Sequence, residues 1–276
     1  ELNNIRNKVL EMLVDSFKVN KNVDEVSYNS SLKEQNNFLK YGGFALNIEQ
    51  EDVLLNSGFE TYTNFGTDYI NNNRVTKKEA FSASHEMLHF IIDNKENNYL
   101  IASQYCNITN SYSLDAFFEM GFSECILSSE LDYLSINSLI NDFKNRHGFL
   151  PNTSIVMYGK LDMMIMRSCP IGTYYKNSQL KCNRCHKNNY ELRDRTNELY
   201  PVVGDSECNT RILNNRPIYL LDRFEEMQEM GIFGYYFLFN FESKNEAYSL
   251  IHEHLENNPH FSRFEHTRGH YQKRPL

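Results

Sequence analysis

Short apolar runs separated by helix-like segments set the strongest limit on the fold of this 276-residue chain. The runs are nearly continuous, a pattern typical of parallel strands that are buried on both faces. A strand followed by a helix at a spacing of about 25 residues predicts an α/β fold, closed as a TIM-like β/α barrel or part of one. The candidate strands are 43–46, 99–104, 124–129, 154–158, 217–221 and 234–239. The candidate helices are 77–92, 114–120, 135–146, 223–230 and 245–255.

Two parts of the chain fall outside this rhythm. Apolar residues at helical spacing in 1–20, followed by the polar, Asn- and Ser-rich segment 21–40, predict an N-terminal helix and linker. The barrel domain is then 41–276, interrupted by a cysteine-containing insertion at about 165–210. Because Glu1 and not Met opens the sequence, we expect a fragment or processed piece of a longer protein.

The composition excludes several classes of protein. A net charge of −8 argues against a broad basic face for nucleic acid, although the last residues form a local basic patch. No apolar run approaches the roughly 20 residues that span a bilayer, and no signal peptide opens the chain, so we expect a cytoplasmic protein without a membrane partner. Asn-, Lys- and Ile-rich usage without Trp is typical of an AT-rich bacterial genome.

Four cysteines share a spacing that suits one metal site. They follow the pattern Cys-x12-Cys-x2-Cys-x22-Cys, and they are Cys169, Cys182, Cys185 and Cys208. The x2 loop lets two sulfurs face one ion, and the outlying pair completes a tetrahedral zinc site or an iron–sulfur cluster. Clustered cysteines in a chain of cytosolic character favour a metal over disulfides. Cys106 and Cys125 lie in strand-like runs and are predicted to be buried thiols.

A second motif has the form His-Glu-x-x-His. On a helix, His85 and His89 would lie one turn apart on one face, with Glu86 beside them as the base of a zinc peptidase. A third ligand is needed, and Glu119 or Glu124 could supply it. The alternative is an amphipathic helix with two surface histidines, because a short motif like this also arises by chance.

Polar residues at strand ends are the candidate catalytic groups, because chemistry in β/α barrels collects at the C-terminal ends of strands. Asn107 and Glu130 each follow a predicted strand, and Tyr158 ends one. The alternative for Asn107 is a turn-forming residue, and the alternative for Glu130 is a surface residue at a helix start.

Three basic residues are candidate cofactor-binding groups. Arg167 precedes the first cysteine of the insertion and could pair with a carboxylate or phosphate. Arg268 and His270 lie in a polar terminal turn that could bind an anion. The alternatives are a surface salt bridge for Arg167 and a solvated tail for the other two.

The second half of the chain resembles peptidase family U32, the collagenase-like proteins. The segments that carry the resemblance are NITNSYSLDAFFEMGFSECILSSEL (107–131), VMYGKLDMMIMRSCPIG (156–172), LRDR (192–195), YPV (200–202) and HTRGHYQKRP (266–275). The first helix, ELNNIRNKVLEML, resembles one found midway through long members, so the chain resembles the C-terminal half of such a protein.

This resemblance implies a function that the residues alone do not give. The chain looks close to the group that hydroxylates a cytidine in 23S ribosomal RNA, which implies an RNA partner and prephenate as a co-substrate. The oxygen-independent quinone hydroxylases of the same family hold a [4Fe–4S] cluster on four cysteines, which implies such a cluster on the four cysteines of this chain. It also implies that the N-terminal half of the same longer protein is a partner. Two alternatives stay open: a peptidase, of U32 type or with zinc at the His-Glu-x-x-His motif, and a non-catalytic barrel half that binds a partner or RNA.

Overall fold

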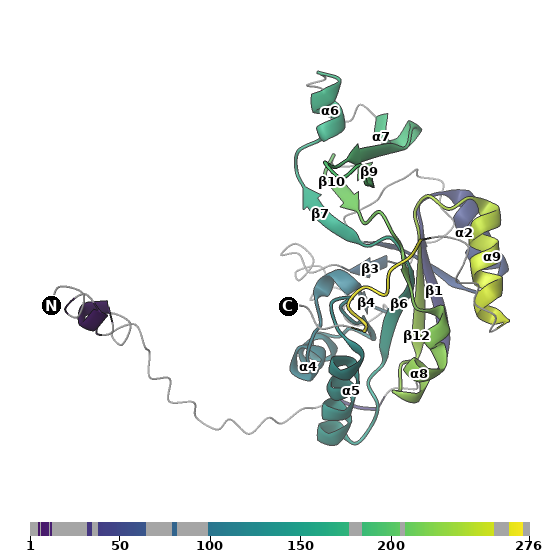
Figure 1. The fold of residues 1–276 in the computed structure, drawn as a ribbon. Coiled ribbons are helices and arrows are strands. Elements are labelled where there is room, and N and C mark those ends of the chain that lie inside the picture. Colours follow the sequence, from purple (N-terminus) through teal and green to yellow (C-terminus); the bar gives the residue numbers. More distant parts are fainter. Residues whose placement is uncertain are drawn as a thin grey trace. The chain divides into compact units, whose positions relative to one another are not determined.

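The computed structural model describes residues 5, 7–10, 12, 32–34, 38–64, 79–81, 99–176, 184–204, 208–256 and 265–272. The chain divides into two compact units, Glu1–Ser31 and Leu32–Leu276. In the first unit the described residues are helical and their side chains are exposed. The second unit contains every strand described below and is the part that Figure 1 labels.

Seven parallel strands form the centre of the second unit. They are β1 (Lys40–Ala45), β2 (Glu60–Asn64), β3 (Glu79–Phe81), β4 (Ile101–Ala102), β5 (Glu124–Ile126), β6 (Thr153–Gly159) and β12 (Gly234–Phe239). Their pairing runs β6–β12–β1–β2–β3–β4–β5 and returns to β6, and every one of these pairs is parallel. A complete TIM barrel has eight such strands, so the predicted partial TIM-like β/α barrel is confirmed.

Helices follow the barrel strands, as this fold requires. They are α2 (Ile48–Asn56), α4 (Ser111–Glu119), α5 (Tyr133–His147), α8 (Phe224–Glu229) and α9 (Lys244–Leu255), with short 3-10 turns η1 (Gln104–Cys106) and η2 (Leu221–Arg223). Side-chain oxygens of Asn47, Asn110, Asp132 and Ser243 accept backbone N–H bonds at the starts of α2, α4, α5 and α9. Such caps fix where these helices begin. None of the described helices is long and apolar enough to cross a membrane.

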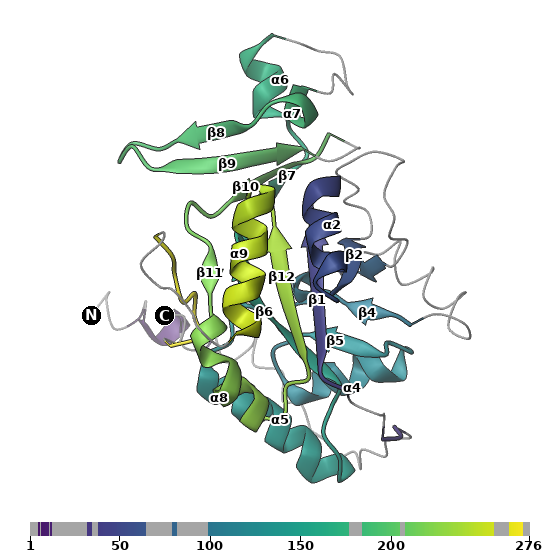
Figure 2. The same cartoon turned by 90° about the vertical axis from the view of Figure 1, so that its right-hand side faces the viewer.

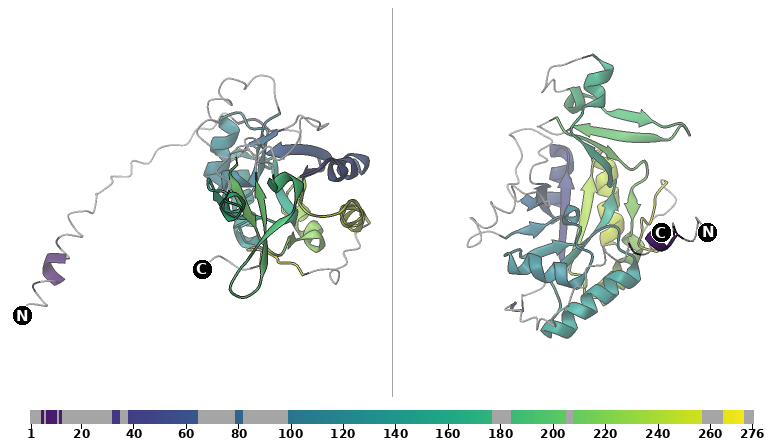
Figure 3. Two further views of the ribbon diagram at one scale, coloured as in Figure 1. Left: turned by 90° about the horizontal axis from the view of Figure 1, so that it is seen from above. Right: turned by 90° about the vertical axis from the view of Figure 1, so that its left-hand side faces the viewer.

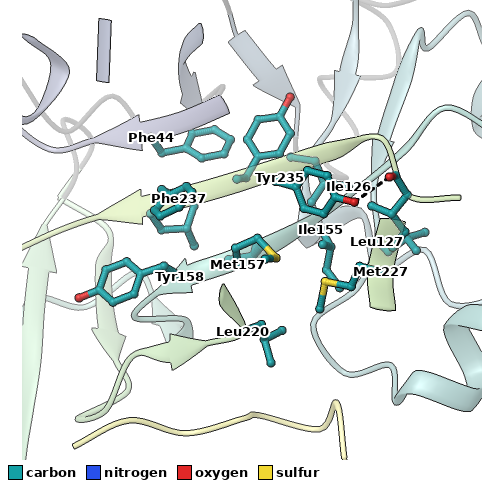
Figure 4. Packing of buried hydrophobic residues seen from close by; sticks show 14 of the residues in the cluster. Phe44, Ile126, Leu127, Ile155, Met157, Tyr158, Leu220, Met227, Tyr235 and Phe237 are labelled. Atoms are coloured by element: carbon teal, nitrogen blue, oxygen red, sulfur yellow. Dashed lines mark hydrogen bonds between the residues drawn. The ribbon is translucent and has the colours of Figure 1, made fainter. Parts of the chain in front are cut away.

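Contacts between strands that are not neighbours in the ring identify the barrel interior. Glu124 on β5 pairs with Lys40 on β1, although β6 and β12 lie between these strands. Tyr62 on β2 packs on Tyr236 of β12 in the same space. On the outer face, Phe237 of β12 packs against His254 of α9. Figure 4 shows part of the apolar cluster that fills both layers.

The cysteine insertion is a separate four-stranded antiparallel sheet in the order β7–β10–β9–β8. Its strands are β7 (Asp162–Met166), β8 (Tyr190–Arg193), β9 (Leu199–Gly204) and β10 (Thr210–Leu213), with short helices α6 (Pro170–Tyr174) and α7 (Arg184–Lys187). Since β7 begins directly after the C-terminal end of β6, the small sheet is attached to the end of the barrel where the parallel strands terminate. Figure 2 shows it beyond the tip of β12, and the right panel of Figure 3 shows the same arrangement from the opposite side.

Three features differ from the sequence-based expectations. The run at 217–221 forms β11 (Ile218–Tyr219), which is antiparallel to β6 and is not one of the parallel barrel strands. The chain enters the insertion from the C-terminal end of β6 and returns to that same end, so β11 runs back along β6. Strand β3 occupies Glu79–Phe81 inside the predicted helix 77–92. The structure also contains α2 and β2, which the apolar pattern does not predict.

Candidate functional site

The N-terminal end of the barrel is filled by a polar network centred on Glu124. This side chain is 1% exposed, and its Oε1 accepts a hydrogen bond from the Tyr236 hydroxyl at 2.7 Å. Its Oε2 lies 2.7 Å from Lys40 Nζ and accepts from the Tyr99 hydroxyl at 3.0 Å, and Ser154 also donates to the carboxylate. The Glu124 carboxylate and its partners fill the N-terminal end of the barrel. In β/α barrels this end contributes to the stability of the fold. All of these contacts of the Glu124 side chain lie inside the barrel.

The C-terminal ends of β4 and β5 bring two candidate catalytic residues together. Asn107 caps η1 with φ 50°, and its side-chain oxygen accepts a hydrogen bond from Ser128 Oγ at 2.9 Å. The backbone N–H of Glu130 donates to the same Oγ at 3.3 Å, and the Glu130 side chain is exposed. Asn107 therefore shapes a turn, as its left-handed backbone suits, and its role toward a substrate stays a prediction, as does that of Glu130.

Tyr158 lies on another face of the barrel wall. The β6–β12 register shifts after Val156, so that Tyr236 pairs with Val156 but Phe237 pairs with Tyr158. This bulge turns Tyr158 to the outer side of the wall, where it packs on Phe237. Its hydroxyl donates to Glu242 at 2.8 Å. Burial and the neighbouring Glu242 carboxylate raise the pKa of Tyr158 well above its usual value, so the phenol keeps its proton.

A pocket of about 690 Å³ adjoins Tyr158 on this outer face. It lies between the ends of β6 and β12, helix α9 and the segment around Pro217. Its charged lining is Lys160, Glu242, Glu246, Glu253 and Glu265. Glu242 was not among the residues singled out in the sequence, although its place two residues after the Asn240 that follows β12 is a strand-end signal of the kind used for Glu130.

Two of the described cysteines leave the small sheet at the same end. Strands β7 and β10 are antiparallel, with Met166 opposite Thr210. Cys169 follows Met166 along β7, and Cys208 precedes Thr210 along β10. In an antiparallel pair, the end of one strand adjoins the start of the other, so both cysteines lie at the same end of the small sheet.

A third cysteine, Cys185, lies at this end of the sheet, where its sulfur closely approaches the backbone of Gly204. Gly204 on β9 also pairs with Thr210, and a Cβ atom on Gly204 would lie 2.6 Å from the Cys185 sulfur. Only glycine leaves room for the sulfur there. Cys169 Sγ accepts a hydrogen bond from the Gly172 N–H at 3.2 Å, at the start of α6.

The fourth cysteine, Cys182, lies outside the described residues, and so do His85, Glu86 and His89. Among the residues that the structure does describe, no group of three or more His, Cys, Asp or Glu side chains is placed to hold a metal ion. The shared site of the four cysteines therefore stays a prediction, and the same holds for the zinc alternative.

A buried ion pair inside the small sheet also contacts the barrel. Asp162 at the start of β7 pairs with Arg211 of β10, and both side chains are almost fully buried. The Arg211 guanidinium also lies 5.1 Å from the ring centre of Tyr105, in η1 at the end of β4. Burial raises the pKa of Asp162, and Arg211 offsets part of that rise. The contact with Tyr105 holds the insertion against the C-terminal end of the barrel strands.

The three candidate cofactor-binding residues are not brought together. Arg167 is exposed beyond the end of β7. Arg268 donates to the carbonyl oxygen of Tyr219 at 3.1 Å and pairs with Asp222, so this guanidinium ties the C-terminal segment to η2. His270 is exposed. Binding of a cofactor by any of them stays a prediction.

Comparisons with known proteins agree with this architecture. No curated protein shows significant sequence similarity to the chain. A solved structure described as that of the U32 peptidase Mk0906 covers 79% of this chain and 99% of its own, at 7% identity and a TM-score of 0.36, a likeness too distant to carry an argument. The family model of peptidase family U32 matches residues 68–235, more than half of the chain, and includes the barrel strands from β3 to the start of β12. This protein therefore belongs to peptidase family U32.

Proposed function

We propose that this U32 protein is part of an RNA-modifying hydroxylase that holds a [4Fe–4S] cluster on Cys169, Cys182, Cys185 and Cys208. The observation that carries the proposal is that Cys169, Cys185 and Cys208 lie at the same end of the small sheet. Thiolates are the ligands of such clusters, and N–H donors to sulfur, such as that of Gly172, are common around them. The bound cluster would supply one-electron chemistry.

Charge supports RNA as the partner of this region. Between Lys160 and Arg216 ten lysines and arginines accompany six aspartates and glutamates, so the segment carries a net charge of +4. The whole chain carries −8, so its positive charge is concentrated on the part that contains the cysteines. A local basic region is the usual electrostatic footprint of a nucleic-acid partner. Prephenate is the co-substrate to supply in an activity assay, and the proposal places the protein in the reducing cytoplasm.

A peptidase is the second candidate, because the matched family is named for that activity. A zinc peptidase at His85, Glu86 and His89 would need no iron. A U32 peptidase would cleave peptides without any need for the cysteines.

Anaerobic purification followed by metal analysis and absorption spectroscopy separates the candidates. The hydroxylase proposal predicts a brown protein with bound iron and broad absorbance near about 400 nm. Cys185→Ala should lose that iron, and Cys125→Ala, which changes a buried cysteine far from the small sheet in sequence, should keep it. A colourless protein with stoichiometric zinc would refute the cluster, and peptide cleavage that survives Cys185→Ala would favour the peptidase.

A further inference from the structure

An aromatic and cationic cluster lies at the cysteine end of the small sheet. Tyr174 ends α6, and its ring meets that of Tyr175 edge-on, with centres 5.1 Å apart. Tyr175 also meets Tyr190 at 6.3 Å, and the Arg184 guanidinium lies 4.5 Å from the Tyr175 ring centre. We call these four residues the tyrosine platform.

The platform is unusually open to solvent for so many aromatic rings. Tyr174 is 80% exposed and Tyr175 is 45% exposed. Exposed tyrosines are common singly, but here the rings contact one another outside the core and a cation lies against one of them. Such an arrangement offers ring faces and edges to a flat partner.

The short helices that carry the platform also carry the cysteines. Cys169 caps the start of α6, the helix that Tyr174 ends. Cys185 directly follows Arg184 in α7. A ligand seated on the platform would therefore lie beside the predicted metal site.

We propose that the tyrosine platform stacks the bases of single-stranded RNA. Proteins that bind single strands combine aromatic rings for stacking with nearby positive charge for the backbone, and both are present on this segment. Exposed Arg167 and Lys176 add positive charge next to Cys169 and Tyr175. The net charge of +4 over 160–216 attracts an anionic polymer, whereas a symmetric contact with a second copy would bring two positively charged segments together. The proposal rests on the proposed function only in its choice of RNA.

Equilibrium binding of a fluorescent single-stranded RNA of about 12 nucleotides to the full chain, at low salt, tests the platform. Loss of one stacked ring weakens binding by about 5- to 150-fold, so Tyr174→Ala should raise Kd by at least about fivefold. Tyr174→Phe keeps the ring and should stay within about twofold of the unchanged protein.

Tyr112 provides the matched control. It is 59% exposed, and the Arg146 guanidinium lies 4.2 Å from its ring centre, but it sits on α4 of the barrel. Tyr112→Ala should leave Kd unchanged. Equal effects of Tyr112→Ala and Tyr174→Ala, or a loss in Tyr174→Phe as large as in Tyr174→Ala, would overturn the proposal.

Failure of the platform and failure of the proposed function give different results. If the unchanged protein binds no RNA, the platform is wrong, while its iron content still decides the cluster. If Cys185→Ala loses iron but binds RNA, and Tyr174→Ala keeps iron but loses RNA, both stand. If Tyr174→Ala changes the oligomeric state in light scattering and not the RNA affinity, the surface binds a second copy of the chain and the proposal is refuted.

Discussion

The polar network at the closed end of the barrel makes a strong prediction about stability. Glu124→Gln removes a charge from a side chain that is 1% exposed and leaves Lys40 without its closest carboxylate. Breaking a buried ion pair from one side typically costs 3–5 kcal/mol, and the partial exposure of Lys40 reduces this to about 3 kcal/mol. Glu60→Gln is the matched control, since it makes the same chemical change next to Lys40, at 3.3 Å, on a side chain that is 44% exposed.

Urea denaturation monitored by circular dichroism measures both variants. Glu124→Gln should lower the transition midpoint by about 1 M for a slope near 3 kcal/mol/M, without a change of slope. Glu60→Gln should lower the free energy of unfolding by at most about 1 kcal/mol, as exposed pairs do. Adding Lys40→Met to Glu124→Gln should recover part of the loss, because both charges are then gone. Equal small effects of the two glutamine variants would refute the reasoning.

Three further predictions concern buried groups. Burial lowers the pKa of His254 from 6.5 to about 4, so protonation of this side chain favours the unfolded chain. The free energy of unfolding should therefore be highest above about pH 6.5 and should fall by about 1.4 kcal/mol per pH unit down to pH 4. His254→Phe should remove this dependence on pH, as measured by urea denaturation at several pH values. Gly204→Ala should cost about 1–3 kcal/mol in the same assay through its clash with the Cys185 sulfur, and much less when combined with Cys185→Ala. Arg211→Met should leave Asp162 buried without its cation and cost about 3 kcal/mol, whereas adding Asp162→Asn should restore most of it.

Local sequence patterns account well for the buried strands. All six predicted strand segments overlap a strand of the structure, because near-continuous apolar runs occur where both faces of a strand are covered. Four predicted helices also correspond to α4, α5, α8 and α9, within a few residues at each end. Caps such as Ser243 define those ends, and they are visible in the sequence.

Strands that contain several polar residues are not predicted by the search for apolar runs. Strand β2 reads ETYTN, and its first residue, Glu60, pairs with Lys40 although the Glu60 side chain is 44% exposed. Lys40 and Glu124 meet although 84 residues separate them in the chain. A pattern search assigns charged residues to the surface, and only closure of the ring shows that they are paired inside it.

A local irregularity separates Tyr158 from the other strand-end candidates. Regular alternation along β6 would direct it to the same face as Ser154, which contacts Glu124 in the interior. The bulge after Val156 reverses that direction. Asn107 and Glu130 follow the ends of their strands, and both contact Ser128, Asn107 through its side chain and Glu130 through its backbone N–H. Strand position was thus predictable from the sequence, whereas side-chain direction was not.

The position of the cysteines constrains the kind of substrate that the proposed chemistry can use. Strand β7 carries the chain from Asp162, whose partner Arg211 contacts Tyr105 of the barrel, to the end of the small sheet where Cys169 and Cys208 lie. Its four residue steps span about 13 Å at the usual rise of a strand. A single strand of RNA on the tyrosine platform would lie beside a metal at that end of the sheet, because Cys169 caps the short helix that Tyr174 ends. For this reason we expect the substrate to be a polymer that contacts the small sheet first, with the barrel holding that sheet in place through Arg211.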